Sequence, residues 1–287
     1  MNLSVLILTF NEEINLPRCL ESVRWADDVL VVDSYSTDRT VEIAQAAGVR
    51  VLQHPFKNFA EQRNFGLAQG NLKHEWVLHL DADEVVSEAF KAEISTIVSL
   101  GSVAKDAYRV ASKMMFEGRW LKRAGMYPSY QVRLGRKTKL TFVQVGHGQR
   151  ECLPPENLGT MVEPLVHYSF GKGLHDWVEK HNRYSTDEAA LLRGANQKAL
   201  DWLGMLASGD PTRRRRSLKR LFLRLPGRPF LRFFYMYFVR LGFMDGLPGY
   251  HYCRLLAFYE LLILLKAKEL KEQGRLQASR QIGSPNQ

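Results

Sequence analysis

The chain has 287 residues, 45% of them hydrophobic, and a formal net charge of +10. This length and composition predict a globular protein with one large or two modest domains. Its three cysteines, Cys19, Cys152 and Cys253, form no CxxC pair, which fits a reducing cytoplasm and gives no signature of a cysteine-ligated metal.

The charge is unevenly distributed along the chain. Residues 1–110 hold 10 Lys and Arg against 16 Asp and Glu, whereas the remainder holds 30 against 14. An acidic front half and a basic back half suggest that one end holds a metal ion while the other faces a polyanion, either nucleic acid or anionic lipid.

Hydrophobic periodicity predicts alternating strands and helices over the first hundred residues. Strands are expected over 3–10, 28–33, 49–53 and 76–80, and helices from 11–13, from about 39 to 48, over 59–69 and from Ser87. The first helix is expected to turn Ile14, Leu16, Leu20 and Val23 inward. This alternation predicts a largely parallel sheet of the doubly wound α/β type.

Three carboxylates, Asp81, Asp83 and Glu84, follow the apolar run that starts at Trp76. On an extended segment Asp81 and Asp83 would share one face, because side chains alternate along a strand. Two oxygen ligands on one face suit Mg²⁺ or Mn²⁺. The alternative is a solvated acidic turn that leads into the helix capped by Ser87.

The first strand is not followed by a glycine-rich turn. Residues 9–13 read Thr-Phe-Asn-Glu-Glu, so the dinucleotide-binding fingerprint is absent, and the chain contains no P-loop. Phosphate groups would therefore have to be handled by a metal ion and basic side chains.

Four motifs in fixed order resemble the inverting family 2 glycosyltransferases, which have the GT-A fold. They are Leu6–Glu13, Val31–Ser34 with Thr37 and Asp38, Gln62-Arg63-Asn64, and Asp81-Ala82-Asp83. Within that family the chain is similar to the branch that builds lipopolysaccharide core and other cell-envelope glycans. The resemblance implies a GT-A core with a C-terminal helical extension.

The resemblance also assigns roles to single residues. The nucleotide of the donor would lie near Thr9, Asn11, Glu12, Asp33, Arg63 and Asp81. Asp83 would bind the Mg²⁺ or Mn²⁺ that bridges the diphosphate, and Asp81 would border both the ribose and this metal ion. For Asn11, Glu12 and Asp38 plain helix capping is the alternative.

An inverting transfer needs a base that takes the proton of the acceptor hydroxyl. The resemblance favours Glu151, in the stretch 146–151, with His147 as its rival. The alternative is that Glu151 pairs with Arg150 or Arg133 at the surface. His167 and Tyr168 end an apolar strand and are expected to belong to the core.

We expect three parts: a nucleotide-sugar-binding core over 1–110, a mixed-β acceptor side over 111–172, and a basic helical extension over 173–287. Short strands are expected over 107–112, 130–134, 140–145 and 162–170. Arg133, Lys180 and Arg183 are candidates for contacts with the acceptor or a phosphate, although solvated helix charges are the alternative for the last two.

Residues 213–237 interleave arginines, including Arg213 to Arg216, with Leu, Phe and Tyr. Such a segment is typical of one that lies in a membrane interface, with a helical cap on the enzyme as the alternative. Two functions therefore compete. One is a glycosyltransferase that moves a sugar from a nucleotide-diphosphate sugar, such as a UDP-hexose, to a lipid-linked acceptor at the inner face of the cell membrane. The other is a basic nucleic-acid-binding protein without enzymatic activity; no nucleic-acid-binding motif is visible, so no nucleic acid is expected as a partner.

Overall fold

The computed structural model describes residues 1–101, 105–145, 148–195 and 227–282, without the side chains of 191, 193–195 and 275–282. The chain forms two compact units, Met1–Gly173 and Leu174–Gln287. The expected boundary between residues 110 and 111 falls inside a single strand, Ala107–Phe116, so the two parts of the first unit share one sheet.

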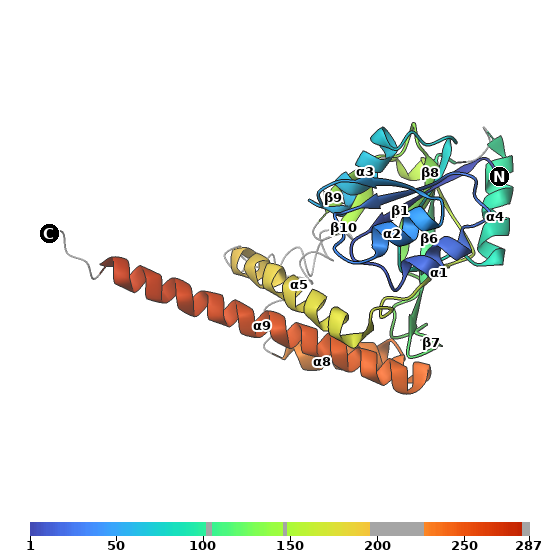
Figure 1. Cartoon of the computed structure of the whole chain (residues 1–287). Coiled ribbons are helices and arrows are strands. Elements are labelled where there is room, and N and C mark those ends of the chain that lie inside the picture. The colour runs from blue at the N-terminus through green and yellow to red at the C-terminus, as the bar shows by residue number, and fades with distance from the viewer. Residues whose placement is uncertain (102–104, 146–147, 196–226, 283–287) are drawn as a thin grey trace. The chain divides into compact units, whose positions relative to one another are not determined.

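The first unit is built on a ten-stranded sheet (Figure 1). Its strands are β1 (Leu3–Thr9), β2 (Val29–Asp33), β3 (Arg50–Gln53), β4 (Trp76–Asp81), β5 (Glu84–Val85), β6 (Ala107–Phe116), β7 (Arg119–Trp120), β8 (Tyr130–Arg136), β11 (Leu158–Thr160) and β12 (Leu165–His167). The main order is β3-β2-β1-β4-β8-β6-β12-β5. Strands β1 to β4 are parallel, and β8 enters antiparallel between β4 and β6. A separate hairpin pairs β9 (Phe142–Val145) with β10 (Gly148–Glu151).

Helices cover both faces of the parallel half, as Figure 1 shows. They are α1 (Leu16–Ser22), α2 (Thr40–Ala46), α3 (Phe59–Gln69) and α4 (Glu88–Ser99). Alternate residues of β1 point to opposite faces, so Val5 and Ile7 join a core with α1 and α4, while Leu6 and Leu8 pack with α3. The predicted α/β alternation is therefore confirmed.

Local signals explain where two of these helices begin and how closely one of them packs. The side chains of Asn58 and Ser87 accept hydrogen bonds from the backbone N–H groups of Glu61 and Phe90, which caps α3 and α4 as N-cap residues do. A Cβ atom on Gly66 would lie 2.4 Å from Leu6 Cδ1, so only glycine allows α3 to approach β1 this closely.

Two local expectations are wrong, and one strand was not predicted. Ile14 is 60% exposed, because α1 starts only at Leu16 and the preceding residues form a turn. The strand expected over 162–170 is confined to Leu165–His167, and Val162 is exposed. The two-residue strand β5 was not expected, because it forms only through its antiparallel pairing with β12.

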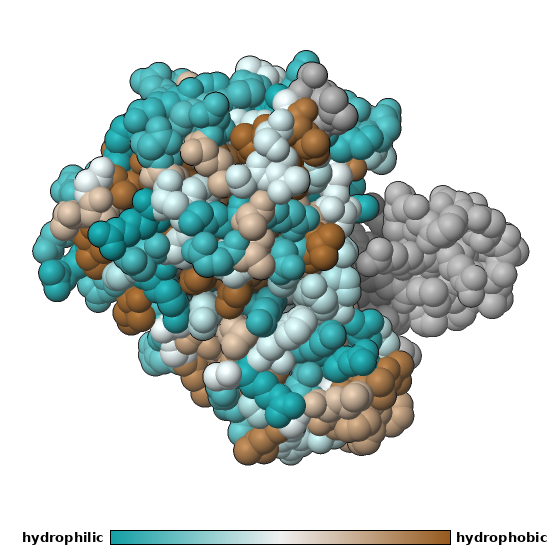
Figure 2. Space-filling model, turned by 90° about the vertical axis from the view of Figure 1, so that its right-hand side faces the viewer, coloured by the Kyte–Doolittle hydropathy of each residue, from teal (hydrophilic) through white to brown (hydrophobic). Residues whose placement is uncertain are grey.

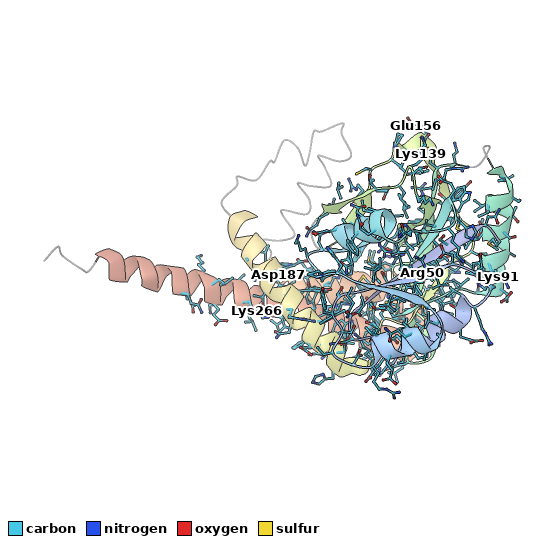
Figure 3. All side chains as sticks on the ribbon, turned by 45° about the horizontal axis from the view of Figure 1, so that its top comes forward. Arg50, Lys91, Lys139, Glu156, Asp187 and Lys266 are labelled. Atoms are coloured by element: carbon cyan, nitrogen blue, oxygen red, sulfur yellow. The ribbon has the colours of Figure 1, made fainter. Side chains whose placement is uncertain are left out.

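The second unit is helical. It contains α5 (Gly173–Ala195), α8 (Arg228–Phe234), the π-helical turn η3 (Tyr235–Val239), the 3₁₀ turn η4 (Gly242–Asp245) and the long helix α9 (Gly246–Ile282). Lys266 of α9 reaches α5, where it donates to Asn182 Oδ1 at 2.7 Å and Thr186 Oγ1 at 2.8 Å (Figure 3, in which Lys266 is labelled). No helix in the described part of the chain has both the length and the apolarity needed to cross a membrane.

Candidate active site

The loops that follow β1 and β2 meet at the carboxyl-terminal edge of the sheet, where α/β proteins bind their ligands. Asp33 ends β2 and is fully buried. Its carboxylate accepts hydrogen bonds from Thr9 Oγ1 at 2.9 Å, from the Ser36 N–H at 2.9 Å and from Gln53 Nε2 at 3.1 Å. As placed, Asp33 fastens the ends of three strands rather than facing a ligand.

The same two loops carry backbone strain at non-glycine residues. Asn11 and Tyr35 have φ values of 53° and 60°, in the left-handed region. Asn11 Oδ1 accepts from the Thr37 N–H at 2.8 Å, and the Asn11 N–H donates to Ser36 Oγ at 2.8 Å. Side chain and backbone thus lock the β1 loop against the β2 loop, and such strain persists where the surrounding structure enforces it.

Glu12 is tied to the end of the first unit rather than open to solvent. Its carboxylate lies 2.8 Å from Lys172 Nζ and accepts from Asn15 Nδ2 at 2.8 Å. Burial raises the pKa of Glu12 despite these partners. Beside it, a Cβ atom on Gly171 would lie 1.9 Å from Asn15 Oδ1, so a larger residue there would push the Asn15 side chain out of its hydrogen bond with Glu12.

Asp81 ends β4 between two arginines. Its Oδ1 lies 2.7 Å from Arg63 Nη2 and its Oδ2 lies 2.6 Å from Arg133 Nη2. Burial alone would raise the pKa of Asp81, but the charges of Arg133 and Arg63 hold it well below its usual range. The expectation that Asp81 and Asp83 share one face of a strand is wrong, because β4 stops at Asp81 and a turn follows.

Arg133 links Asp81 to Glu84. Its Nη2 lies 2.6 Å from Glu84 Oε1, and Glu84 Oε2 accepts from the Asp81 N–H at 2.9 Å. The Arg133 side chain is 4% exposed, so it does not lie at the surface beside Glu151. Burial raises the pKa of Glu84, yet the paired guanidinium supplies a compensating charge. The four groups form a charge-balanced cluster under the acidic turn.

Asp83 and His167 form a second polar pair. His167 Nε2 lies 3.1 Å from Asp83 Oδ2, and its Nδ1 lies 3.2 Å from Ser112 Oγ. Burial alone would lower the pKa of His167, but Asp83 raises it to about 9. His167 was expected to be a core residue. It reaches the acids because β12 pairs with β5 and aligns His167 with Glu84.

Three consecutive residues of α3 fasten three different parts of the site. Successive helical side chains point about 100° apart, so neighbours along the chain reach separate partners. Gln62 Nε2 donates to Ser34 Oγ at 3.0 Å, and Arg63 pairs with Asp81. Asn64 donates to the Phe142 carbonyl at 2.9 Å and accepts from the Phe142 N–H at 3.0 Å. Arg63 is 1% exposed, so as placed it acts on Asp81 rather than on a solvent-borne ligand.

The base candidates lie at the β9–β10 hairpin. Glu151 ends β10, is half-buried and pairs in register with Phe142, the residue that Asn64 holds. His147 lies outside the described residues. Arg150 is exposed on the same strand.

The two remaining basic candidates, Lys180 and Arg183, are exposed on α5 in the second unit. Nothing in their surroundings assigns them a ligand.

The residues that would hold a metal ion are Asp83 and His167. Among the described residues no group of three or more His, Cys, Asp and Glu side chains is placed to hold one. A carboxylate oxygen and an imidazole nitrogen 3.1 Å apart nevertheless fit a cation that takes most of its other ligands from substrate phosphates and water. Asp81 fits this role poorly, because both its oxygens already accept from guanidinium groups.

Polar side chains at strand ends, rather than a glycine-rich turn, form this site, which places the chain among the α/β proteins that bind ligands at the carboxyl-terminal edge of the sheet. Residues 4–149 match the sequence model of the family "Glycosyl transferase family 2". The chain belongs to this family and is a glycosyltransferase.

Relatives agree with the family. The chain is 29% identical over 283 residues to an uncharacterized glycosyltransferase of Rickettsia bellii (strain RML369-C), covering 94% of this chain and 87% of the relative. It is 27% identical over 193 residues to the lipopolysaccharide core biosynthesis glycosyltransferase LpsC of Rhizobium meliloti (strain 1021), covering 65% and 70%. Among solved structures, S. aureus TarS 1-349 in complex with UDP-GlcNAc aligns with a TM-score of 0.41 and 13% identity, covering 88% of this chain and 90% of that one.

The predicted fold class, a GT-A α/β fold with a C-terminal helical extension, is confirmed. Family membership makes the chain an enzyme and overturns the alternative of a nucleic-acid-binding protein without activity.

Proposed function

We propose that the protein is an inverting glycosyltransferase that takes its sugar from a nucleotide-diphosphate sugar, with a UDP-hexose as the first candidate. The observation that carries this proposal is the Asp83–His167 pair beside the sealed cluster of Asp81, Glu84 and two arginines. A diphosphate needs a cation at one position, and Asp83 and His167 offer a carboxylate oxygen and an imidazole nitrogen 3.1 Å apart outside the two-arginine cluster.

Asp83 and His167, once the imidazole has released its proton to solvent, would hold Mn²⁺ or Mg²⁺, which would neutralise the charge that develops on the departing diphosphate. An imidazole ligand favours Mn²⁺ over Mg²⁺, because Mg²⁺ prefers oxygen donors. Asp81 keeps the turn in place through its two guanidinium contacts. Thr9, Asn11, Glu12 and Asp33 shape the loops where the nucleotide would lie, through the contacts already described.

Glu151 is the proposed base, and His147 remains its rival. The carboxylate would take the acceptor hydroxyl's proton while the sugar carbon is attacked from the side opposite the diphosphate. Asn64 supports the role of Glu151, since it ties the hairpin that carries the carboxylate to the helix that carries Arg63.

The proposed acceptor is a lipid-linked or lipopolysaccharide-type glycan, reached at the inner face of the cell membrane by a peripheral protein. The relative named for lipopolysaccharide core biosynthesis supports this acceptor class. The net charge of +10, concentrated in the back half, supports attraction to an anionic membrane surface.

Hydrolysis of the donor tests the function without knowledge of the acceptor. Purified full-length protein is incubated with a panel of nucleotide sugars, with Mn²⁺, with Mg²⁺ or with a chelator, and nucleoside diphosphate release is measured. We expect release from one donor class that needs the cation and is lost in Asp83→Ala. The exposed acid Asp27 provides the matched control, and Asp27→Ala should keep full activity. Full release in chelator, or an active Asp83→Ala protein, would contradict the metal role.

A further inference from the structure

The helical segment from α8 through η3 exposes an apolar face to solvent. Its solvent-facing positions are apolar and recur at intervals of three to four residues: Phe230, Leu231, Phe234, Tyr235, Phe238 and Val239. Its inward positions include the basic Arg228, which is 1% exposed and pairs with Glu260 of α9. A helix in water normally places its charges outward, so this face requires a nonpolar environment.

The chain reversal that follows continues the same surface. Leu241, Phe243, Met244 and Leu247 are all exposed, and Leu247 is 64% exposed. Leu241 has a φ of 60°, a left-handed conformation that a bulky residue rarely adopts. A glycine would make this turn without strain. The turn instead presents a large apolar side chain to solvent, and strain of this kind points to a functional demand.

Aromatic packing holds the exposed rings in place. Phe233 stacks on Tyr237 with ring centroids 5.2 Å apart and contacts Tyr250 of α9 at 6.0 Å. Phe234 lies 5.2 Å from Phe238. The surface is therefore a supported aromatic ridge. Figure 2 shows brown and tan residues gathered at the lower right of its view, at the level where Figure 1 draws α8 and the start of α9.

Charge decides what covers this ridge. Between residues 227 and 259 the only acid is Asp245, which is buried, while Arg232, Arg240 and Arg254 are basic and at least partly exposed. Aromatic rings flanked by arginines and free of exposed carboxylates match the boundary between headgroups and acyl chains, where basic side chains reach the phosphates. A protein interface would gain specificity from charges of both signs. This stretch exposes basic side chains but no acidic ones.

We infer that the exposed apolar surface between Phe230 and Leu247 inserts into the interface of a phospholipid bilayer with anionic headgroups. This inference deepens the proposed function and rests on it, since the surface would bring that enzyme to a lipid-linked acceptor. The segment expected from the sequence to contact a membrane was 213–237, and its residues 213–226 lie outside the described residues. The inference assigns membrane contact to described residues that continue past this segment, as far as Leu247.

Partition of the full-length protein into vesicles tests the inference. The probe is vesicles of equal phosphatidylcholine and phosphatidylglycerol, with the bound fraction measured by sedimentation. The variant combines Phe230→Ser, Val239→Ser and Leu247→Ser, three of the most exposed side chains, which are 77%, 59% and 64% exposed. The matched control combines Phe56→Ser, Leu100→Ser and Val162→Ser, which are exposed apolar residues of the first unit.

We expect the wild type and the control to bind, and to keep part of their binding at about 0.5 M salt, because apolar insertion is not screened. The triple variant should bind about tenfold or more weakly, since it loses three inserted side chains. Its melting temperature should not fall, because those side chains are exposed in the folded protein.

Three results would overturn the inference: a wild type that ignores the vesicles, a triple variant that binds as well as the wild type, or self-association that the triple variant abolishes while neither protein binds lipid. The last result would make the ridge an interface between copies. Donor hydrolysis, measured without vesicles on the same preparations, separates the two proposals. Hydrolysis without lipid binding overturns only this inference, and lipid binding without hydrolysis overturns only the proposed function.

Discussion

Arg133 Nη2 lies 2.6 Å from Asp81 Oδ2, although 52 residues separate the two in sequence. The contact forms because β8 inserts antiparallel beside β4 and carries Arg133 under the acidic turn. Asp81 and Glu84 are thereby neutralised from within the protein. Asp83 lies outside this cluster, with its Oδ2 3.1 Å from His167 Nε2.

Removing the arginine should destabilise the fold. Arg133→Met leaves Asp81 and Glu84 buried with one guanidinium between them, and breaking a buried ion pair costs about 3–5 kcal/mol. Urea denaturation followed by circular dichroism measures the loss. Adding Glu84→Gln to Arg133→Met should restore part of it, because one uncompensated charge is then removed.

The exposed pair Arg39–Glu42 is the matched control. Its side chains are 70% and 64% exposed, so Arg39→Met should leave the unfolding free energy nearly unchanged. Equal losses of unfolding free energy in Arg133→Met and Arg39→Met would show that the buried cluster stabilises the fold no more than an exposed ion pair does.

The Asp83–His167 pair should make stability depend on pH. Asp83 raises the folded-state pKa of His167 to about 9 against burial, whereas the unfolded value is about 6.5. The contribution is fully present below about pH 6.5 and is lost as pH rises through about 9, and it amounts to no more than about 3 kcal/mol. Unfolding free energies in chelator at several pH values should therefore fall over this window. In Asp83→Asn the fall should shrink, and an unchanged pH profile there would assign the effect to other groups.

Much of the first unit could be predicted from the sequence because its signals are local. The strands that end at Thr9, Asp33 and Asp81 and the caps Asn58 and Ser87 depend on neighbouring residues only. The location of the site could also be predicted, because the carboxyl ends of parallel strands lie at the same edge of a sheet.

The predictions that were wrong concern side chains whose positions depend on pairing between strands far apart in sequence. His167 looks like the end of an apolar strand until β12 pairs with β5 and sets it opposite Glu84. Arg133 looks like a surface cation until β8 enters the sheet. The hydrophobic periodicity of β8 and β12 does not predict which strands they pair with. The positions of these two side chains could therefore not be predicted from the sequence.

The identity of the base is testable at Glu151. Glu151→Gln keeps the size of the side chain but cannot accept the proton, so transfer should fall about 10²- to 10⁴-fold. Nucleotide affinity, measured by calorimetry, should stay near the wild-type value. His147→Ala is the companion variant. Normal transfer by Glu151→Gln together with loss in His147→Ala would give the role to the histidine.

The arginine run from Arg213 to Arg216 should contribute attraction to anionic membranes that is separable from the aromatic ridge. Each basic residue near an anionic surface contributes about 1 kcal/mol, and this attraction is screened by salt, whereas buried aromatic side chains are not. Replacing all four arginines with serine should therefore release much of the protein from anionic vesicles at low salt but leave binding at high salt nearly unchanged. The variant Phe230→Ser, Val239→Ser, Leu247→Ser should show the opposite pattern, with the larger loss at high salt. Donor hydrolysis should survive in both, because the acids of the site lie in the first unit. Identical salt dependence of vesicle binding in the two variants would contradict separate contributions from electrostatic attraction and apolar insertion.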